Sequence, residues 1–116
     1  MIDLAKWEQI ASAEIHNRKK VAGRLGGRIA IVTGSAQGFG KGIAEELYRE
    51  GACVVIADLN EPLAKTVADS LGERAVAVKV DVSSEKSVAG MIAACVESFG
   101  GLDLFVSNAG VLKAGS

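Results

Sequence analysis

The stretch Ile29–Gly40, with the sequence IAIVTGSAQGFG, constrains the fold of this chain more than any other. Its apolar start predicts a buried strand, and after its end apolar residues recur at spacings of three and four, as on one face of a helix. Three glycines occupy the turn between them: Gly34, Gly38 and Gly40. Glycines let the backbone turn tightly and let a phosphate approach closely, and the N-terminus of the next helix offers free N–H groups. The stretch therefore predicts a phosphate-binding turn.

The spacing of these glycines is G-x-x-x-G-x-G, which differs from the common dinucleotide pattern G-x-G-x-x-G. A P-loop is disfavoured at two positions: Ser35 stands where its first glycine would fall, and Gly42 where its Ser or Thr would fall. A tight turn with incidental glycines is the alternative that this motif leaves open by itself.

The rest of the chain repeats the same alternation of strand and helix. We expect strands over residues 28–33, 53–57, 75–80 and 102–106. Helices are expected over 38–50, from a cap at Asn60 to Gly72, and from a cap at Ser83 or Ser84 to Phe99. The strands are nearly continuous apolar runs, as in a parallel sheet that helices cover on both faces. The fold class is α/β, a doubly wound, Rossmann-type parallel sheet truncated after its fourth strand.

Residues 1–20 predict a helix that precedes this alternation. Its apolar stripe consists of Leu4, Trp7, Ile10, Ala11 and Ile15. A charged, glycine-containing stretch follows it. We therefore divide the chain into an N-terminal helical extension and linker, 1–24, and a partial NAD(P)-binding domain, 25–116.

Composition excludes several classes of function. The net charge of −1 over 116 residues gives no electrostatic case for binding nucleic acid or an anionic membrane. No apolar run is long enough for a membrane span, and the N-terminus has no signal-peptide core, so a cytoplasmic location is expected. Cys53 and Cys95 are too few for a zinc site and predict buried thiols.

Polar residues follow the later strands at the edge where a doubly wound sheet binds its ligand. Asp58 follows the second strand, where a carboxylate accepts hydrogen bonds from ribose hydroxyls and repels a 2′-phosphate, which favours NAD over NADP. Asp81 follows the third strand, where it could accept a hydrogen bond from an adenine amino group. The alternatives are that Asp58 caps the second helix and that Asp81 caps the third.

With these motifs in this order, the sequence resembles the short-chain dehydrogenase/reductase family. TGSAQGFG at 33–40 is similar to its cofactor loop, Asp81-Val82 to its adenine-contacting pair, and LDLFVSNAG at 102–110 to its N-N-A-G segment. The resemblance implies NAD as cofactor, with NADP less favoured. It implies hydride transfer between nicotinamide and a small alcohol or carbonyl substrate, with a polyol or sugar phosphate as the narrower expectation. A homo-oligomer is expected, with no nucleic-acid or membrane partner.

The resemblance also implies a role for each matching position. Glycines 34, 38 and 40 shape the pyrophosphate loop, and Phe39 donates its backbone N–H there. Ser35, Gln37, Asp58 and Leu59 lie near the adenosine ribose, and Asp81 and Val82 hold adenine. The expected cofactor-binding residues are Gly34, Ser35, Gln37, Gly38, Phe39, Gly40, Asp58, Leu59, Asp81, Val82, Asn108, Ala109 and Gly110.

The sequence departs from the family pattern in three respects. Ser107 replaces the first Asn of N-N-A-G, which keeps a polar side chain. Phe39 replaces a branched aliphatic residue, so we expect its bulk to need room under the loop. The family's catalytic Asn, Ser, Tyr and Lys lie beyond the N-N-A-G segment, so no catalytic residue is expected in residues 1–116 and these residues alone are expected to be inactive. The alternative function is a non-catalytic, truncated nucleotide-binding or assembly module.

Overall fold

The computed structural model describes residues 23–108, which form a four-stranded parallel sheet with strand order β3-β2-β1-β4. The elements are β1 (Ile29–Thr33), α2 (Gly38–Arg49), β2 (Cys53–Asp58), α3 (Glu61–Leu71), β3 (Ala75–Lys79), α4 (Glu85–Phe99) and β4 (Leu104–Ser107). The predicted α/β, doubly wound sheet is confirmed. The expected N-terminal helix lies outside the described residues, so the division of the chain at residues 24 and 25 stays a prediction.

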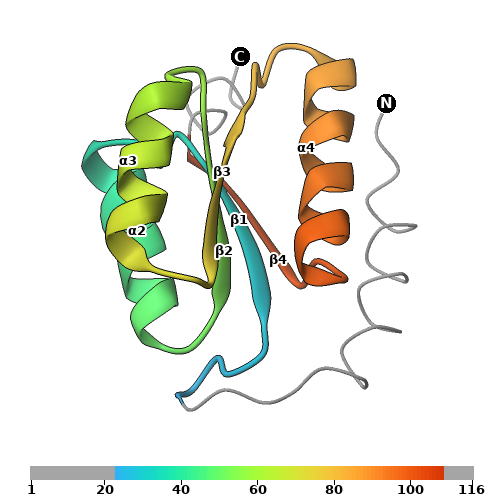
Figure 1. Ribbon diagram of the computed structural model, residues 1–116. Coiled ribbons are helices and arrows are strands. Elements are labelled where there is room, and N and C mark those ends of the chain that lie inside the picture. The colour runs from blue at the N-terminus through green and yellow to red at the C-terminus, as the bar shows by residue number, and fades with distance from the viewer. Residues whose placement is uncertain (1–22, 109–116) are drawn as a thin grey trace.

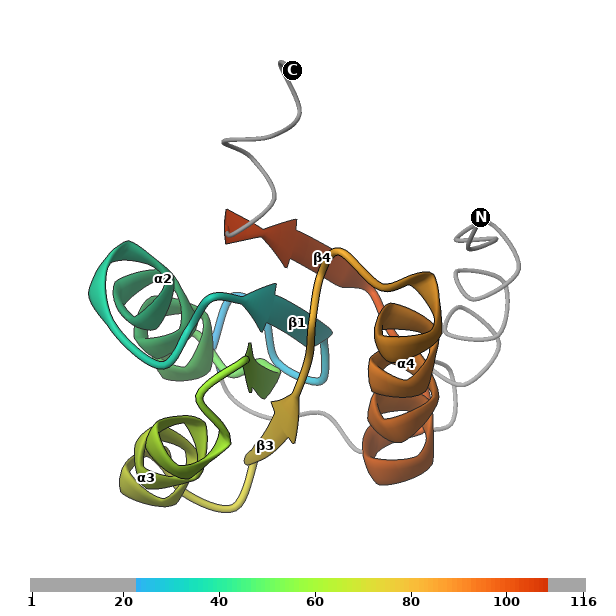
Figure 2. The same cartoon turned by 90° about the horizontal axis from the view of Figure 1, so that it is seen from above.

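The described residues form three layers, with α2 and α3 on one face of the sheet and α4 on the other (Figures 1 and 2). Successive residues of each strand enter opposite layers: Ile31 packs in the α4 layer and Val32 in the α2–α3 layer. The chain winds outward from β1 to β3 and returns through α4 to place β4 on the other side of β1. The strand order therefore reverses at β1, the position where doubly wound sheets bind their ligands.

Short polar side chains and glycines fix the ends of the helices. The Asn60 side chain accepts a hydrogen bond from the Leu63 N–H at 3.1 Å, and Ser84, rather than Ser83, accepts one from the Ser87 N–H at 3.1 Å. The helix α4 ends at Gly100, whose φ of +85° is in the left-handed region that glycine tolerates best.

The fourth strand begins two residues later than the sequence predicts. The Asp103 N–H donates to the Ile29 carbonyl at 2.8 Å, while the Asp103 carboxylate accepts from the Ile29 N–H at 2.8 Å. A side-chain oxygen therefore takes the place of a strand carbonyl at this position. Regular pairing with β1 starts only at Leu104, which lies opposite Ala30.

Arg74 joins the layer of α2 and α3 to the far end of the sheet. Its guanidinium donates to the Tyr48 carbonyl at 3.1 Å and to the Ala52 carbonyl, and it lies 3.9 Å from the centroid of the Tyr48 ring. The planar guanidinium serves two carbonyls and an aromatic face at once, which an ammonium group cannot reproduce. Arg74 therefore fixes the C-terminal end of α2 against the turn before β3.

We predict that Arg74→Lys lowers the free energy of unfolding by about 1–3 kcal/mol, because hydrogen bonds from a charged donor and a cation–π contact are lost. Urea unfolding followed by circular dichroism measures this difference. Arg49→Lys is the matched control, since Arg49 forms only an exposed ion pair with Glu46. Equal effects of the two substitutions would contradict the role assigned to Arg74.

Candidate dinucleotide-binding site

The carboxyl ends of the four strands meet at one edge of the sheet, and the turns that follow them carry the predicted site residues. Three of the exposed large hydrophobic side chains in the described residues follow these strands. They are Phe39, Leu59 and Val82, with 88%, 63% and 40% of their surface exposed. Apolar side chains left open to solvent beside a polar loop are a common sign of a ligand-binding surface.

The three glycines of the loop have different structural roles. Gly34 and Gly38 have φ values of +67° and +63°, which side chains other than glycine adopt only at a cost. A Cβ at Gly40 would lie 2.1 Å from the Gly34 carbonyl oxygen and 3.0 Å from Asn108 Nδ2, so α2 can approach the loop only with glycine there. A Cβ at Gly38 would meet no protein atom within 4 Å. Gly38 therefore borders open space, into which a ligand can fit.

The N-terminus of α2 differs from those of the other two helices. Its cap residue Gln37 makes no side-chain capping hydrogen bond, and its first turn contains no acidic residue. In contrast, α3 and α4 each have a side-chain cap and an acid in the first turn. The first N–H groups of α2 are thus free of side-chain caps, and no carboxylate offsets the positive end of its dipole. Together with the open space at Gly38, this end of α2 suits an anion such as a pyrophosphate.

Asp58 lies at the end of β2 and connects it to the glycine loop. One carboxylate oxygen accepts from the Ala36 N–H at 3.1 Å, and the other accepts from the Asn60 N–H at 3.1 Å. Because Asn60 caps α3, the alternative that Asp58 caps this helix is wrong. A carboxylate has about four acceptor positions, so further hydrogen bonds from ribose hydroxyls remain possible.

Ser35 is buried where the glycine loop leaves the sheet. Its hydroxyl donates to the Val32 carbonyl at 2.6 Å and accepts from the Ala57 N–H at 3.1 Å, and the residue is 0% exposed. The side chain thus extends the pairing of β1 and β2 into the loop. Its expected place near the ribose stays a prediction, and the hydroxyl has a structural role in the described residues.

Asp81 forms a tight turn after β3. Its carboxylate accepts hydrogen bonds from the Ser83 hydroxyl at 2.6 Å and from the Ser83 N–H at 3.0 Å, and these bonds lower the pKa of the Asp81 carboxyl. The alternative that Asp81 caps the third helix is wrong, because Ser84 does so. Asp81 is therefore held in its ionised form as an exposed hydrogen-bond acceptor at this edge.

Phe39 is exposed at the start of α2. We expected its bulk to need room beneath the turn, but the residue is 88% exposed, so this expectation is wrong. The physical reason is its position in the first turn of α2, where the neighbouring Gly40 makes the close approach to the loop and Phe39 faces outward.

Asn108 is the last described residue, and its side chain reaches the loop after β1. Its amide donates to the Gly34 carbonyl at 3.5 Å. The buried Thr33 hydroxyl makes a second link, donating to the Val106 carbonyl at 3.5 Å. Sequence reasoning did not assign Thr33 this role, although the residue belongs to the quoted loop motif. Ala109 and Gly110, which were expected to line the site, lie outside the described residues.

We searched residues 23–108 for clustered metal ligands and for helices that could span a membrane. Within residues 23–108, no cluster of three His, Cys, Asp or Glu side chains is arranged to hold a metal ion. No helix among the same residues is long and apolar enough to cross a membrane. Cys95 is buried as predicted, whereas Cys53 is only partly buried.

Comparison with known proteins agrees with this geometry. Residues 28–116 match the short chain dehydrogenase family. Galactitol 2-dehydrogenase of Agrobacterium fabrum is 41% identical over 88 residues, which are 76% of this chain and 34% of that protein. Sorbitol dehydrogenase of Cereibacter sphaeroides is 41% identical over 86 residues, which are 74% of this chain and 34% of that protein.

Two crystal structures have the same fold. Hydroxysteroid dehydrogenase from Escherichia coli superposes with a TM-score of 0.69 at 36% identity, covering 72% of this chain and 37% of the other. A 3-ketoacyl-(acyl-carrier-protein) reductase from Brucella melitensis, complexed with NADH, superposes with a TM-score of 0.67 at 38% identity, covering 68% and 33%. The chain thus spans about a third of the length of the relatives that it matches. It belongs to the short-chain dehydrogenase family, whose members bind NAD(P), and corresponds to the N-terminal, nucleotide-binding region of that family.

Proposed function

We propose that this chain is the NAD-binding part of an oxidoreductase that transfers a hydride between a secondary alcohol or ketone and nicotinamide. The observation that carries the proposal is the uncapped N-terminus of α2 next to the open space at Gly38. A pyrophosphate there would accept hydrogen bonds from the first N–H groups of α2. When bound, the cofactor would accept or give the hydride, and the residues of this chain would bind and orient it.

The proposed preference for NAD rests on Asp58. Its carboxylate is held at the end of β2 by the Ala36 and Asn60 N–H groups. The carboxylate thus carries a negative charge between the glycine loop and the start of α3. The family resemblance implies that the adenosine ribose binds there. Ribose hydroxyls can donate to this carboxylate, whereas a 2′-phosphate would be repelled by it.

For the substrate, we propose a polyol or another secondary alcohol. Two relatives with about 41% identity are named for galactitol and for sorbitol. Among the described residues, Tyr48 is not available for proton transfer at the carboxyl edge, because it lies at the C-terminal end of α2 beneath Arg74. Proton transfer to or from the substrate is therefore proposed for residues beyond those described.

We predict that Gly38→Ala weakens NADH binding by at least tenfold, because its Cβ projects into the space proposed for the pyrophosphate. A fluorescence titration with NADH measures the dissociation constant. A positive φ costs about 1–2 kcal/mol for alanine wherever it occurs, so a control must carry the same strain.

Gly100→Ala is that control, since Gly100 also has a positive φ and lies at the end of α4, remote from the loop. It should lower the unfolding free energy similarly and leave the NADH titration unchanged. If Gly38→Ala bound NADH like the native chain, the pyrophosphate site would be wrongly assigned.

We also predict that Asp58→Asn raises the affinity for NADP relative to NAD by about tenfold, because removing a charge close to the 2′-phosphate lowers the repulsion by about 1.4 kcal/mol. Titrations with both dinucleotides provide the ratio. Asp69→Asn removes an equal charge from the exposed flank of α3 and should leave the ratio unchanged. A native chain that prefers NADP would refute the role of Asp58.

A further inference from the structure

Lys79, the last residue of β3, lies beside Asp58 at the carboxyl edge of the sheet. In the parallel pairing of β2 with β3, Asp58 lies opposite Lys79, and the Val80 N–H donates to the Asp58 carbonyl at 3.0 Å. Neighbouring strands of a sheet lie about 4.8 Å apart. The register therefore holds a positively charged residue one strand away from the carboxylate that is proposed to bind the ribose.

Asp58 and Lys79 belong to the same face of the sheet. Residues that are paired in register share a face, and successive residues of a strand alternate between the two faces. Ile56 and Ala77 are paired two residues earlier in the strands, and both pack in the layer of α2 and α3. Asp58 and Lys79 therefore also lie on this face, the one on which α3 begins directly after Asn60.

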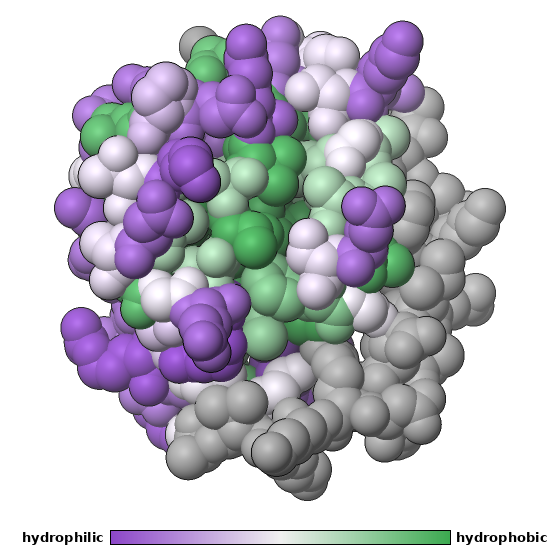
Figure 3. All heavy atoms as spheres, in the orientation of Figure 1, coloured by the Kyte–Doolittle hydropathy of each residue, from purple (hydrophilic) through white to green (hydrophobic). Residues whose placement is uncertain are grey.

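The Lys79 side chain is open to solvent and to ligands. Lys79 is the one exposed residue of β3, whose other residues are half-buried. Among residues 23–108, Lys79 forms no ion pair with a carboxylate. Figure 3 shows apolar residues gathered over β3 and mostly hydrophilic residues above them, where Figure 1 places the carboxyl end of this strand. The ammonium group can therefore meet an anion that binds at this edge.

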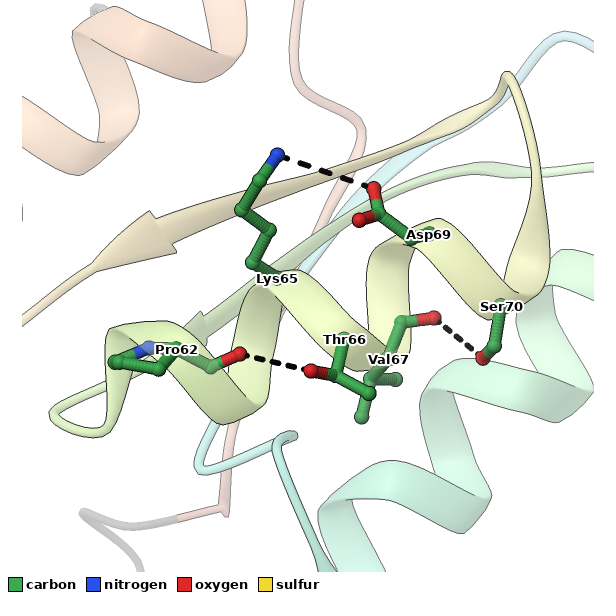
Figure 4. Close-up of polar contacts among 6 residues, drawn as sticks. All are labelled: Pro62, Lys65, Thr66, Val67, Asp69 and Ser70. Atoms are coloured by element: carbon green, nitrogen blue, oxygen red, sulfur yellow. Dashed lines mark hydrogen bonds and ion pairs between the residues drawn. The ribbon is translucent and has the colours of Figure 1, made fainter.

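The other charged residues beside β3 are arranged along α3. Lys65 lies 4.0 Å from Asp69, and Figure 4 shows both on the same flank of this helix. They line a groove between α3 and β3, together with Glu61 from the first turn of α3. The Lys65 ammonium is thus directed toward a carboxylate nearer the C-terminal end of α3. Lys79, in contrast, is the cation that the register holds beside Asp58.

We propose that Lys79 forms a subsite for the 2′-phosphate of NADP, so that this chain accepts NADP as a second, weaker dinucleotide. The inference rests on the proposed binding of the adenosine ribose at Asp58. The additional phosphate of NADP is attached to the 2′-oxygen of that ribose, next to the carboxylate. A Lys ammonium is a compact charge on a flexible four-carbon stem, which lets it turn toward a phosphate one strand away.

Lys79 acts differently on the two dinucleotides. The 2′-phosphate is repelled by the Asp58 carboxylate and attracted by the Lys79 ammonium, so the attraction offsets part of the repulsion. NAD has an uncharged hydroxyl at the same position, which donates to Asp58 and gains little from a nearby cation. Asp58 therefore sets the preference for NAD, and Lys79 limits how strongly NADP is disfavoured.

Fluorescence titrations of the chain of residues 1–116 with NADPH and with NADH test this subsite. Lys79→Gln should weaken NADPH binding by about fivefold or more at low salt and change NADH binding by less than about twofold, because only NADPH carries a charge at this position. Lys79→Arg keeps the charge and should bind NADPH within about twofold of the native chain. Lys65→Gln removes an equal charge from α3 and should leave both dissociation constants unchanged.

Salt provides a second readout, since the difference between the native chain and Lys79→Gln in NADPH binding should shrink at about 1 M salt, where the screening length is about 3 Å. Equal NADPH affinities of the two chains at low salt, with NADH bound normally, would overturn the subsite alone. An equal loss of NADH and NADPH binding in Lys79→Gln would indicate a structural role and would also overturn it. A native chain that binds neither dinucleotide would instead refute the proposed function, and the subsite with it.

Discussion

The close approach of α2 to the end of β1 is the constraint on which the rest of the site depends. The helix meets the loop backbone directly, since any side chain at Gly40 would overlap the Gly34 carbonyl. This contact aims the N-terminus of α2 at the carboxyl edge of the sheet and brings Asn108, at the end of β4, against the same carbonyl. The orientation of the α2 dipole and the contact with the end of β4 thus both depend on the absence of a side chain at Gly40.

Hydrogen bonds that are buried at Ser35 and more exposed at Asp58 then hold the loop in place. Ser35 joins the strands β1 and β2 just beyond their last paired residues, and the Asp58 carboxylate joins the loop to the start of α3. The loop is therefore preorganised before any ligand binds, so its N–H groups need no rearrangement to meet an anion. Preorganisation of this kind lowers the entropic cost of binding.

Much of this arrangement could be predicted from the sequence. Apolar runs and turn glycines locate each strand and helix to within a few residues, because burial on both faces of a parallel sheet leaves a strong pattern. Side-chain direction could not be predicted. The burial of Ser35, the exposure of Phe39 and the substitution of the Asp103 carboxylate for a strand carbonyl depend on contacts between segments distant in sequence.

The central claim is that the N-terminus of α2 binds the pyrophosphate of a dinucleotide. Amide chemical shifts of the ¹⁵N-labelled chain during addition of NAD test it most directly, because they report the contact residue by residue even when binding is weak. We expect the largest saturable changes at Gly38, Phe39 and Gly40, with smaller ones at Leu59 and Val82. Unchanged amides in the glycine loop, with saturable changes elsewhere such as the groove between α3 and β3, would contradict it.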